Sequence, residues 1–295
     1  MADKSNERES LNDLRGEIDE IDEQLHDLLV RRGGLVERIR AVKRLESIAT
    51  VRPGREAFIL RKLKNRHKGN FPVGAVFRIW REIIAGITRM EMSEYNIAVY
   101  TAEGDQGYWD LARDQFGTMT PMTGYSSRRD VLRVVDEGNS TLGVVPCPSE
   151  DDTDPWWIGL MVPDGLRVAY KLPFFADTNA RTTANGPAVA FAIGRILPEP
   201  SDSDRTLLVL VTEEPLSRAA LADLTERAEL PSTMLASSQQ GDWFHLVEID
   251  GFVSEKDERL TALNDTEEIL RISVLMKKNI LTICLKEPQK STGIH

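Results

Sequence analysis

Two cationic side chains occupy positions on an apolar helical stripe near the start of the chain. Apolar residues recur at three- and four-residue steps from Leu11 to Leu28, and the next position of the stripe is Arg32. Lys43 follows eleven residues later, about 16 Å along a helix and on the same side of it. Because burying a charge without a partner is costly, we expect Arg32 and Lys43 to hold one anionic molecule between them.

Each of the next two expected helices also carries a charge on its apolar face. Glu56 lies on the face of Leu60, and Glu91 follows Ile84 and Ile87 at three- and four-residue steps. We expect these charges to pair with one another or with a ligand, and a buried ion pair without function is the alternative reading of each one.

Arg15 also lies near the inward face of the first helix. It precedes Arg32 by 17 residues, about 25 Å of helix, so it cannot reach the same ligand. An antiparallel helix from a second subunit would bring its own Arg15 to the Arg32 end. The spacing therefore predicts a homodimer with two shared sites.

The periodicity of the chain predicts a multidomain protein with an all-α unit, an α/β unit and a small α+β unit. Residues 9–46, 54–66 and 72–91 are expected helices, and the first is long enough to need another long helix as its partner. Residues 197–205 read as a linker or surface loop before the last unit. The expected strands are 96–100, 142–146, 166–170, 188–194, 206–211 and 245–251, followed by either 271–275 or 280–285, and the other expected helices are 126–138, 215–227 and 257–269.

Composition disfavours several classes of function. The net charge of −10 argues against nucleic acid and anionic membranes as partners, whereas residues 31–90 hold 16 Lys and Arg against 4 Asp and Glu. Such a basic segment suits a small anionic ligand, with a solvated helix face as the alternative for most of its residues.

The sequence shows no membrane span and no secretory signal, so we expect a cytoplasmic protein with Cys147 and Cys284 reduced. The four histidines form no cluster, and we expect no metal and no cofactor.

Four segments together resemble the all-helical chorismate mutase family over about residues 8–92: LRGEIDEIDEQLHDLLVRR, LVERIRAVK, PGRE and IWREIIAGITRME. The resemblance implies an intertwined helical dimer that converts chorismate to prephenate without a cofactor or a covalent intermediate. This reaction is an intramolecular rearrangement. Its site must therefore select the compact substrate conformer and stabilise the charge that separates across the breaking ether bond.

The resemblance also implies roles for individual residues. Arg32 and the partner's Arg15 bind the two substrate carboxylates, a task suited to the guanidinium fork. Lys43 donates to the ether oxygen, Glu56 accepts from the ring hydroxyl, and Arg55 supports the site.

Three positions depart from the family pattern. Glu91 stands where the family usually has Gln as second donor to the ether oxygen, and an ionised carboxylate can only accept, so Glu91 must be protonated to act there. Arg52 replaces a common acidic residue, and Ile87 replaces a common small polar residue. These changes leave a weakened or altered mutase open.

The rest of the chain resembles a reduced form of the prephenate dehydratase part of bifunctional enzymes. NSTLGVVPCPSED carries this likeness within residues 95–200, and GDWFHLVEIDGFVSEKDERLTAL is similar to an ACT domain within residues 205–286. The family's Thr-Arg-Phe motif reads Val189-Ala190-Phe191 here, so the hydroxyl expected to act in dehydration is absent. MLASS replaces the Glu-Ser-Arg-Pro motif, and an aromatic amino acid is the candidate effector.

Three functions remain open from the sequence. The first is a chorismate mutase with a degenerate extension, the second a regulatory or scaffold dimer that binds an aromatic-pathway metabolite without turnover, and the third a working bifunctional enzyme. The complete set of Arg15, Arg32, Lys43 and Glu56 favours the mutase, because a scaffold would not need it.

Overall fold

The computed structural model describes residues 10–46, 50–102, 105–150, 152–175, 181–196 and 204–275. In the last turns of the first helix it describes the backbone alone at residues 41 and 43–46. The chain forms two compact units, residues 1–48 and 49–295, each of which is described by itself. Among the described residues no helix is long and apolar enough to cross a membrane.

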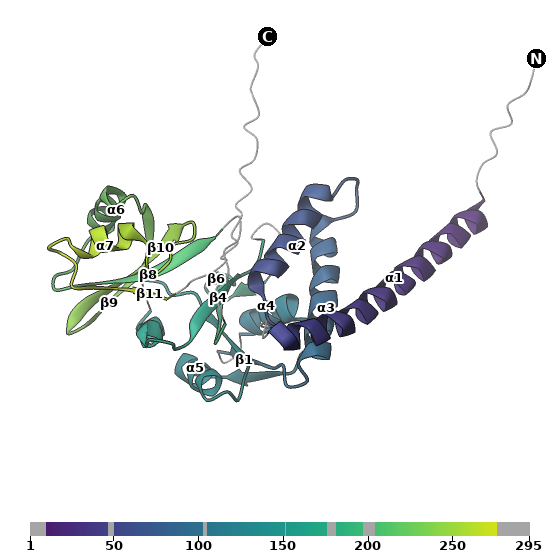
Figure 1. Ribbon diagram of the computed structural model, residues 1–295, viewed down its shortest axis with the longest axis horizontal. Coiled ribbons are helices and arrows are strands. Elements are labelled where there is room, and N and C mark those ends of the chain that lie inside the picture. Colours follow the sequence, from purple (N-terminus) through teal and green to yellow (C-terminus); the bar gives the residue numbers. More distant parts are fainter. Residues whose placement is uncertain are drawn as a thin grey trace, which may run out of the picture. The chain divides into compact units, whose positions relative to one another are not determined.

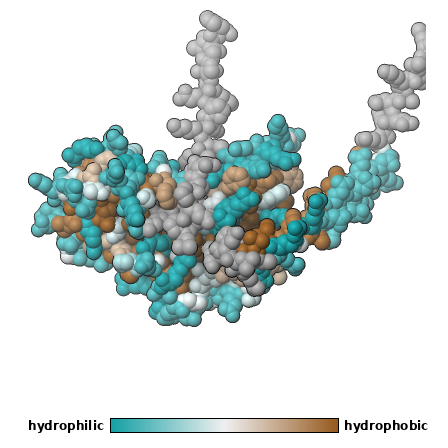
Figure 2. Space-filling view, viewed as in Figure 1, coloured by the Kyte–Doolittle hydropathy of each residue, from teal (hydrophilic) through white to brown (hydrophobic). Residues whose placement is uncertain are grey.

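The first unit is one helix, α1 (Leu11–Glu46), and it confirms the expected helix 9–46. A capping box begins it, since the Ser10 hydroxyl accepts from the backbone N–H of Asp13 at 3.2 Å and the Asp13 carboxylate accepts from the backbone N–H of Ser10 at 3.1 Å. The apolar stripe from Leu11 to Leu28 is exposed in the single chain, and Figure 2 shows hydrophobic residues along the length of α1. Such a face is typical of a helix that binds a partner.

The second unit begins with two helices, α2 (Pro53–Arg66) and α3 (Val73–Glu91), as expected for 54–66 and 72–91. Pro53 suits the first position of α2, where a backbone N–H is not needed. Leu60 from α2 and Phe77 from α3 share a small core with Phe175, whose ring stacks on Phe77 at 4.2 Å between centroids.

A five-stranded sheet of order β2-β1-β3-β7-β4 follows, in which β2, β1 and β3 are parallel to one another and β7 is antiparallel to both of its neighbours, β3 and β4. Helix α4 packs on one face and helix α5 with the 3₁₀ turn η1 on the other. The elements are β1 (Ile97–Tyr100), α4 (Gly107–Phe116), β2 (Met122–Tyr125), α5 (Arg128–Asp136), β3 (Leu142–Pro146), η1 (Trp156–Met161), β4 (Arg167–Leu172), the short hairpin β5 (Thr182–Thr183) and β6 (Gly186–Pro187), and β7 (Ala190–Gly194).

A second sheet, antiparallel and of order β11-β8-β10-β9, lies beside the first and shares its core. One face is covered by α6 and α7 (Figure 1). On the other face Leu207 and Val209 pack in one cluster with Phe191 and Ile193 of the first sheet. The elements are β8 (Arg205–Thr212), α6 (Arg218–Arg227), β9 (Ser232–Gln240), β10 (Asp242–Asp250), α7 (Glu258–Asn264) and β11 (Arg271–Val274).

The structure departs from the sequence expectations at several elements. Helix α7 ends at Asn264, not at residue 269, because Asn264 and Asp265 are weak helix formers that favour a terminus. Six elements were not expected at all: α4, β2, η1, β5, β6 and β9. The alternative 271–275 for the last strand is confirmed by β11, whereas 280–285 and most of the linker 197–205 lie outside the described residues.

Gly117, which follows the last residue of α4, lies where α4 packs closely against α3. Its φ of 84° and ψ of 153° are accessible only to glycine, and a Cβ there would lie 2.5 Å from that of Ala85 on α3. We expect Gly117→Ala to lower the free energy of unfolding by roughly 3 kcal/mol or more, from backbone strain and overpacking together. Urea denaturation measures this loss.

Gly138 provides the matched control, since its φ of 77° is also positive but a Cβ there would meet no atom within 4 Å. Gly138→Ala should therefore cost only about 1 kcal/mol. Equal losses in the two variants would show that the contact with Ala85 does not limit the approach of the two helices.

Candidate functional site

Helix α1 carries three of the expected substrate-binding residues on one continuous helical backbone. Arg15 is exposed and Arg32 is half-buried, while Lys43 lies in the last turns, where its side chain is outside the described residues. The helix is unbroken through Gly33 and Gly34, so the helical spacings used above are confirmed.

The first turn of α2 carries three more of the expected residues. Arg52 occupies the N-cap position, and Arg55 is exposed, with its guanidinium 5.2 Å from the ring centroid of Phe58. Glu56 lies in the same turn and is turned inward, with 15% of its side chain exposed. Glu91 is the last residue of α3 and is half-buried.

Glu56 is held by two donors. Arg81 Nη1 of α3 donates to Glu56 Oε2 at 2.7 Å, and the hydroxyl of Tyr170 on β4 donates to Glu56 Oε1 at 2.8 Å. Burial raises the pKa of Tyr170 well above its ordinary value, and the negative charge of Glu56 adds to the shift. Tyr170 is therefore a neutral donor throughout the physiological pH range.

Neither Arg81 nor Tyr170 was among the residues expected from the sequence. Arg81 follows Phe77 by one helical turn, so its place on the buried face of α3 could have been read from the periodicity. Tyr170 lies 114 residues from Glu56 and gives no comparable signal.

Within the described residues, no group of three or more His, Cys, Asp or Glu side chains could hold a metal ion. Cys147 is a free thiol, and burial raises its pKa to about 12, so it is a poor nucleophile at neutral pH.

The helical part of the chain matches the model of a known protein family. The family described as chorismate mutase type II matches residues 14–92. Residues 14–92 carry the chorismate mutase pattern. The expected resemblance is thereby confirmed, and we call residues 14–92 the mutase segment.

Curated relatives combine such a mutase with a second enzyme. The bifunctional chorismate mutase/prephenate dehydratase of Aquifex aeolicus is 34% identical over 142 residues, which are 47% of this chain and 39% of the relative. The enzyme of the same description from Stutzerimonas stutzeri is 28% identical over 145 residues, 48% of this chain and 39% of the relative. The chain thus matches about two fifths of the length of these relatives.

Solved structures of prephenate dehydratases are similar at a lower level. The enzyme from Streptococcus mutans has a TM-score of 0.45 and 12% identity, covering 64% of this chain and 100% of its own. The enzyme from Arthrobacter aurescens in complex with L-Phe has a TM-score of 0.46 and 11% identity, covering 61% of this chain and 89% of its own.

The bond between Tyr170 and Glu56 should contribute measurably to the stability of the second unit. We expect Tyr170→Phe to lower the free energy of unfolding by roughly 1.5–3 kcal/mol, because a buried carboxylate loses one of its donors. Denaturant unfolding of both single variants and the double variant with Glu56→Gln gives the coupling energy of the pair.

Tyr125→Phe on β2 is the matched control, since its hydroxyl makes no hydrogen bond within the described part of the chain. A coupling energy near zero would mean that the two groups do not interact in solution.

Proposed function

We propose that the protein is a chorismate mutase that rearranges chorismate to prephenate in aromatic amino acid biosynthesis. The observation that carries the proposal is the match of residues 14–92 to the mutase family. This segment contains Arg15, Arg32, Lys43 and Glu56, the charged set that the family resemblance implies. A cytoplasmic enzyme without a cofactor is the corresponding expectation.

In this proposal the protein binds the substrate in its reactive conformation and stabilises the charge that develops during the reaction, without forming a covalent bond to it. Arg32 and the partner's Arg15 hold the two carboxylates, which fixes the substrate in its compact conformer. Lys43 and a protonated Glu91 donate to the ether oxygen as negative charge develops on it. Glu56 accepts from the ring hydroxyl, with Arg52 and Arg55 near the same end of α2.

The rate of loss of chorismate absorbance, followed over about pH 5 to 8, tests this proposal. We expect Glu91→Gln to turn over faster than the wild type, because an amide always carries a donor whereas a carboxylate donates only when it is protonated. An unchanged or slower rate in Glu91→Gln would remove Glu91 from the mechanism while leaving the mutase assignment intact.

Product analysis separates the mutase from its alternatives. Prephenate without phenylpyruvate is expected, because Val189-Ala190-Phe191 stand where dehydratases carry Thr-Arg-Phe. Formation of phenylpyruvate would instead support a bifunctional enzyme, and absence of turnover throughout the pH range would support a scaffold.

An aromatic amino acid remains the proposed effector of residues 205–286. A calorimetric titration with phenylalanine that gives no heat would contradict this proposal.

We further propose that the active form is a homodimer in which α1 pairs with α1 of a second subunit. Support comes from the exposed apolar stripe of α1 and from the 17-residue distance between Arg15 and Arg32 on one unbroken helix. In such a dimer each site takes Arg15 from one subunit and Arg32 and Lys43 from the other.

Complementation between inactive subunits tests this sharing. Arg15→Ala and Lys43→Ala should each be inactive alone, whereas a heterodimer of the two has one intact site and one site with both changes. Co-expression should therefore restore about a quarter of wild-type activity if subunits pair at random. Arg32→Ala with Lys43→Ala is the control pair, because both residues belong to the same side of the site and no activity should return. Failure of the first pair to complement would contradict shared sites.

A further inference from the structure

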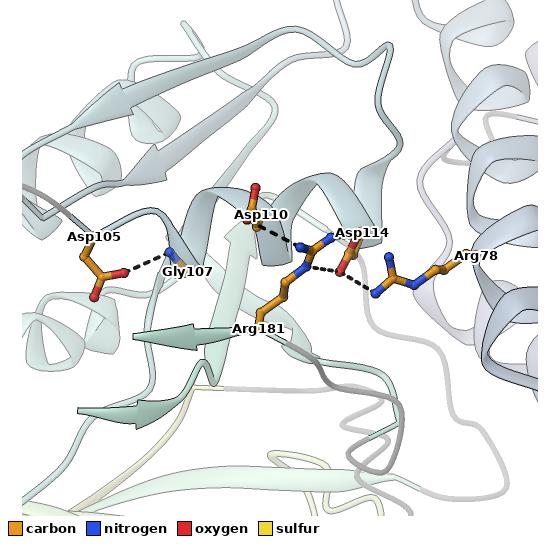
Figure 3. A network of polar contacts seen from close by, with 6 residues as sticks. All are labelled: Arg78, Asp105, Gly107, Asp110, Asp114 and Arg181. Atoms are coloured by element: carbon orange, nitrogen blue, oxygen red, sulfur yellow. Dashed lines mark hydrogen bonds and ion pairs between the residues drawn. The ribbon is translucent and has the colours of Figure 1, made fainter. Parts of the chain in front are cut away.

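Charged groups at the contact of α3 with α4 are satisfied within the second unit. Asp114 of α4 accepts from Arg78 of α3 at 3.1 Å and from Arg181 at 2.7 and 2.9 Å (Figure 3). Arg181 also pairs with Asp110 at 3.5 Å, so two arginines balance two aspartates and the network needs no ligand. The outer edge of the second sheet is different.

Strand β11 forms that edge, and it has backbone groups left to pair. Among the described strands it bonds only to β8, over Arg271–Val274. Just beyond it, the carbonyl oxygen of Leu275 accepts from the backbone N–H of Val168 on β4 at 3.3 Å. Every second residue of an edge strand turns its N–H and C=O groups away from the sheet, so such an edge can receive another strand.

A groove of about 480 Å³ lies along this edge. It is lined by Ile272, Ser273 and Val274 of β11, by Leu260 and Thr261 of α7, and by Leu160 and Met161 of η1. A strand placed here would therefore meet α7 on one face and η1 on the other. The charged lining residues are Arg167 and Glu255, and because their charges are opposite, the groove suits an uncharged occupant.

The chain itself continues from this groove. Val274 lines it, and Leu275 is the last residue that the structure describes. The sequence then reads MKKN over residues 276–279 and ILTICL over residues 280–285. A short, nearly continuous apolar run is typical of a strand that is buried on both faces. Four residues are enough to connect two antiparallel strands.

We propose that residues 280–285 fill this groove as a further strand of the second sheet, antiparallel to β11. A four-residue connection sets the register. The opposite pairs are Val274 with Leu281, Ser273 with Thr282, Ile272 with Ile283, and Leu270 with Leu285.

This register matches the two strands residue by residue. Apolar side chains face each other on the side of α7, where Ile272 and Val274 already pack in one cluster with Leu260. Leu285 covers Leu270, which is 52% exposed in the described structure. A connection one residue longer or shorter would place Thr282 opposite an apolar residue and turn every side chain to the other face.

Disulfide trapping in the full chain tests the strand and its register together. Opposite residues of antiparallel strands have Cα atoms about 4.5–5.5 Å apart, a separation that a disulfide can span. With Cys284→Ser to remove a competing thiol, we expect Ser273→Cys and Thr282→Cys to join within one chain under mild oxidation. Mass spectrometry of the peptides identifies the bond.

Ser291→Cys in place of Thr282→Cys is the matched control, because it lies beyond Pro288 in the same tail. Its loop to position 273 is twice as long, and an unattached tail would close the two loops at rates within about threefold of each other. We expect the bond between positions 273 and 282 to form roughly tenfold faster or more, because strand pairing holds its thiols together. Rates within threefold would overturn the proposal, as would a bond between two chains, which would assign the groove to a second copy.

Ile283→Asp shows whether apolar contacts hold the strand in the groove. A carboxylate against α7 should release it, so backbone amides of Arg271–Val274 should exchange with deuterium roughly tenfold faster than in the wild type. Ile294→Asp, the same change beyond Pro288, is the control and should exchange as the wild type does. Urea denaturation verifies that both variants are folded. Equal exchange in Ile283→Asp and wild type would also overturn the proposal.

Discussion

The contact of Glu56 with Arg81 and Tyr170 is the interaction on which the second unit depends. It joins the first turn of α2, the middle of α3 and strand β4, three segments that the chain could otherwise arrange in many ways. Because both charges are almost removed from water, neither can lose its partner without a large cost. Glu56 is therefore fixed in position by two elements of the second unit besides its own helix.

The sequence predicted the helices of this protein well and the contacts between them poorly. Boundaries of α1, α2 and α3 followed from apolar periodicity and from Pro53, both of which are local signals. The inward turn of Glu56 was predicted for the same reason. Its partner Tyr170 and the burial of Gln115 were not, because they arise only when segments distant in the sequence pack together. Strand β9 was missed because polar residues such as Ser237 and Gln239 interrupt its apolar pattern.

A second constraint acts within the sheets. Leu207, Val209 and Leu246 of the four-stranded sheet pack in one cluster with Phe191 and Ile193 of the five-stranded sheet. Lys171 and Glu248 add a largely buried ion pair between the two sheets, at 2.9 Å. Two sequence regions that resemble separate domains are thus parts of one packed structure.

This shared core has a consequence for how such a chain can change over evolution. Loss of either sheet would leave the other with an exposed apolar face, because Leu207 and Val209 of one sheet pack in the same cluster as Phe191 and Ile193 of the other. A substitution at one of these core positions therefore acts on the folding of both sheets at once, and the two sheets can change only together.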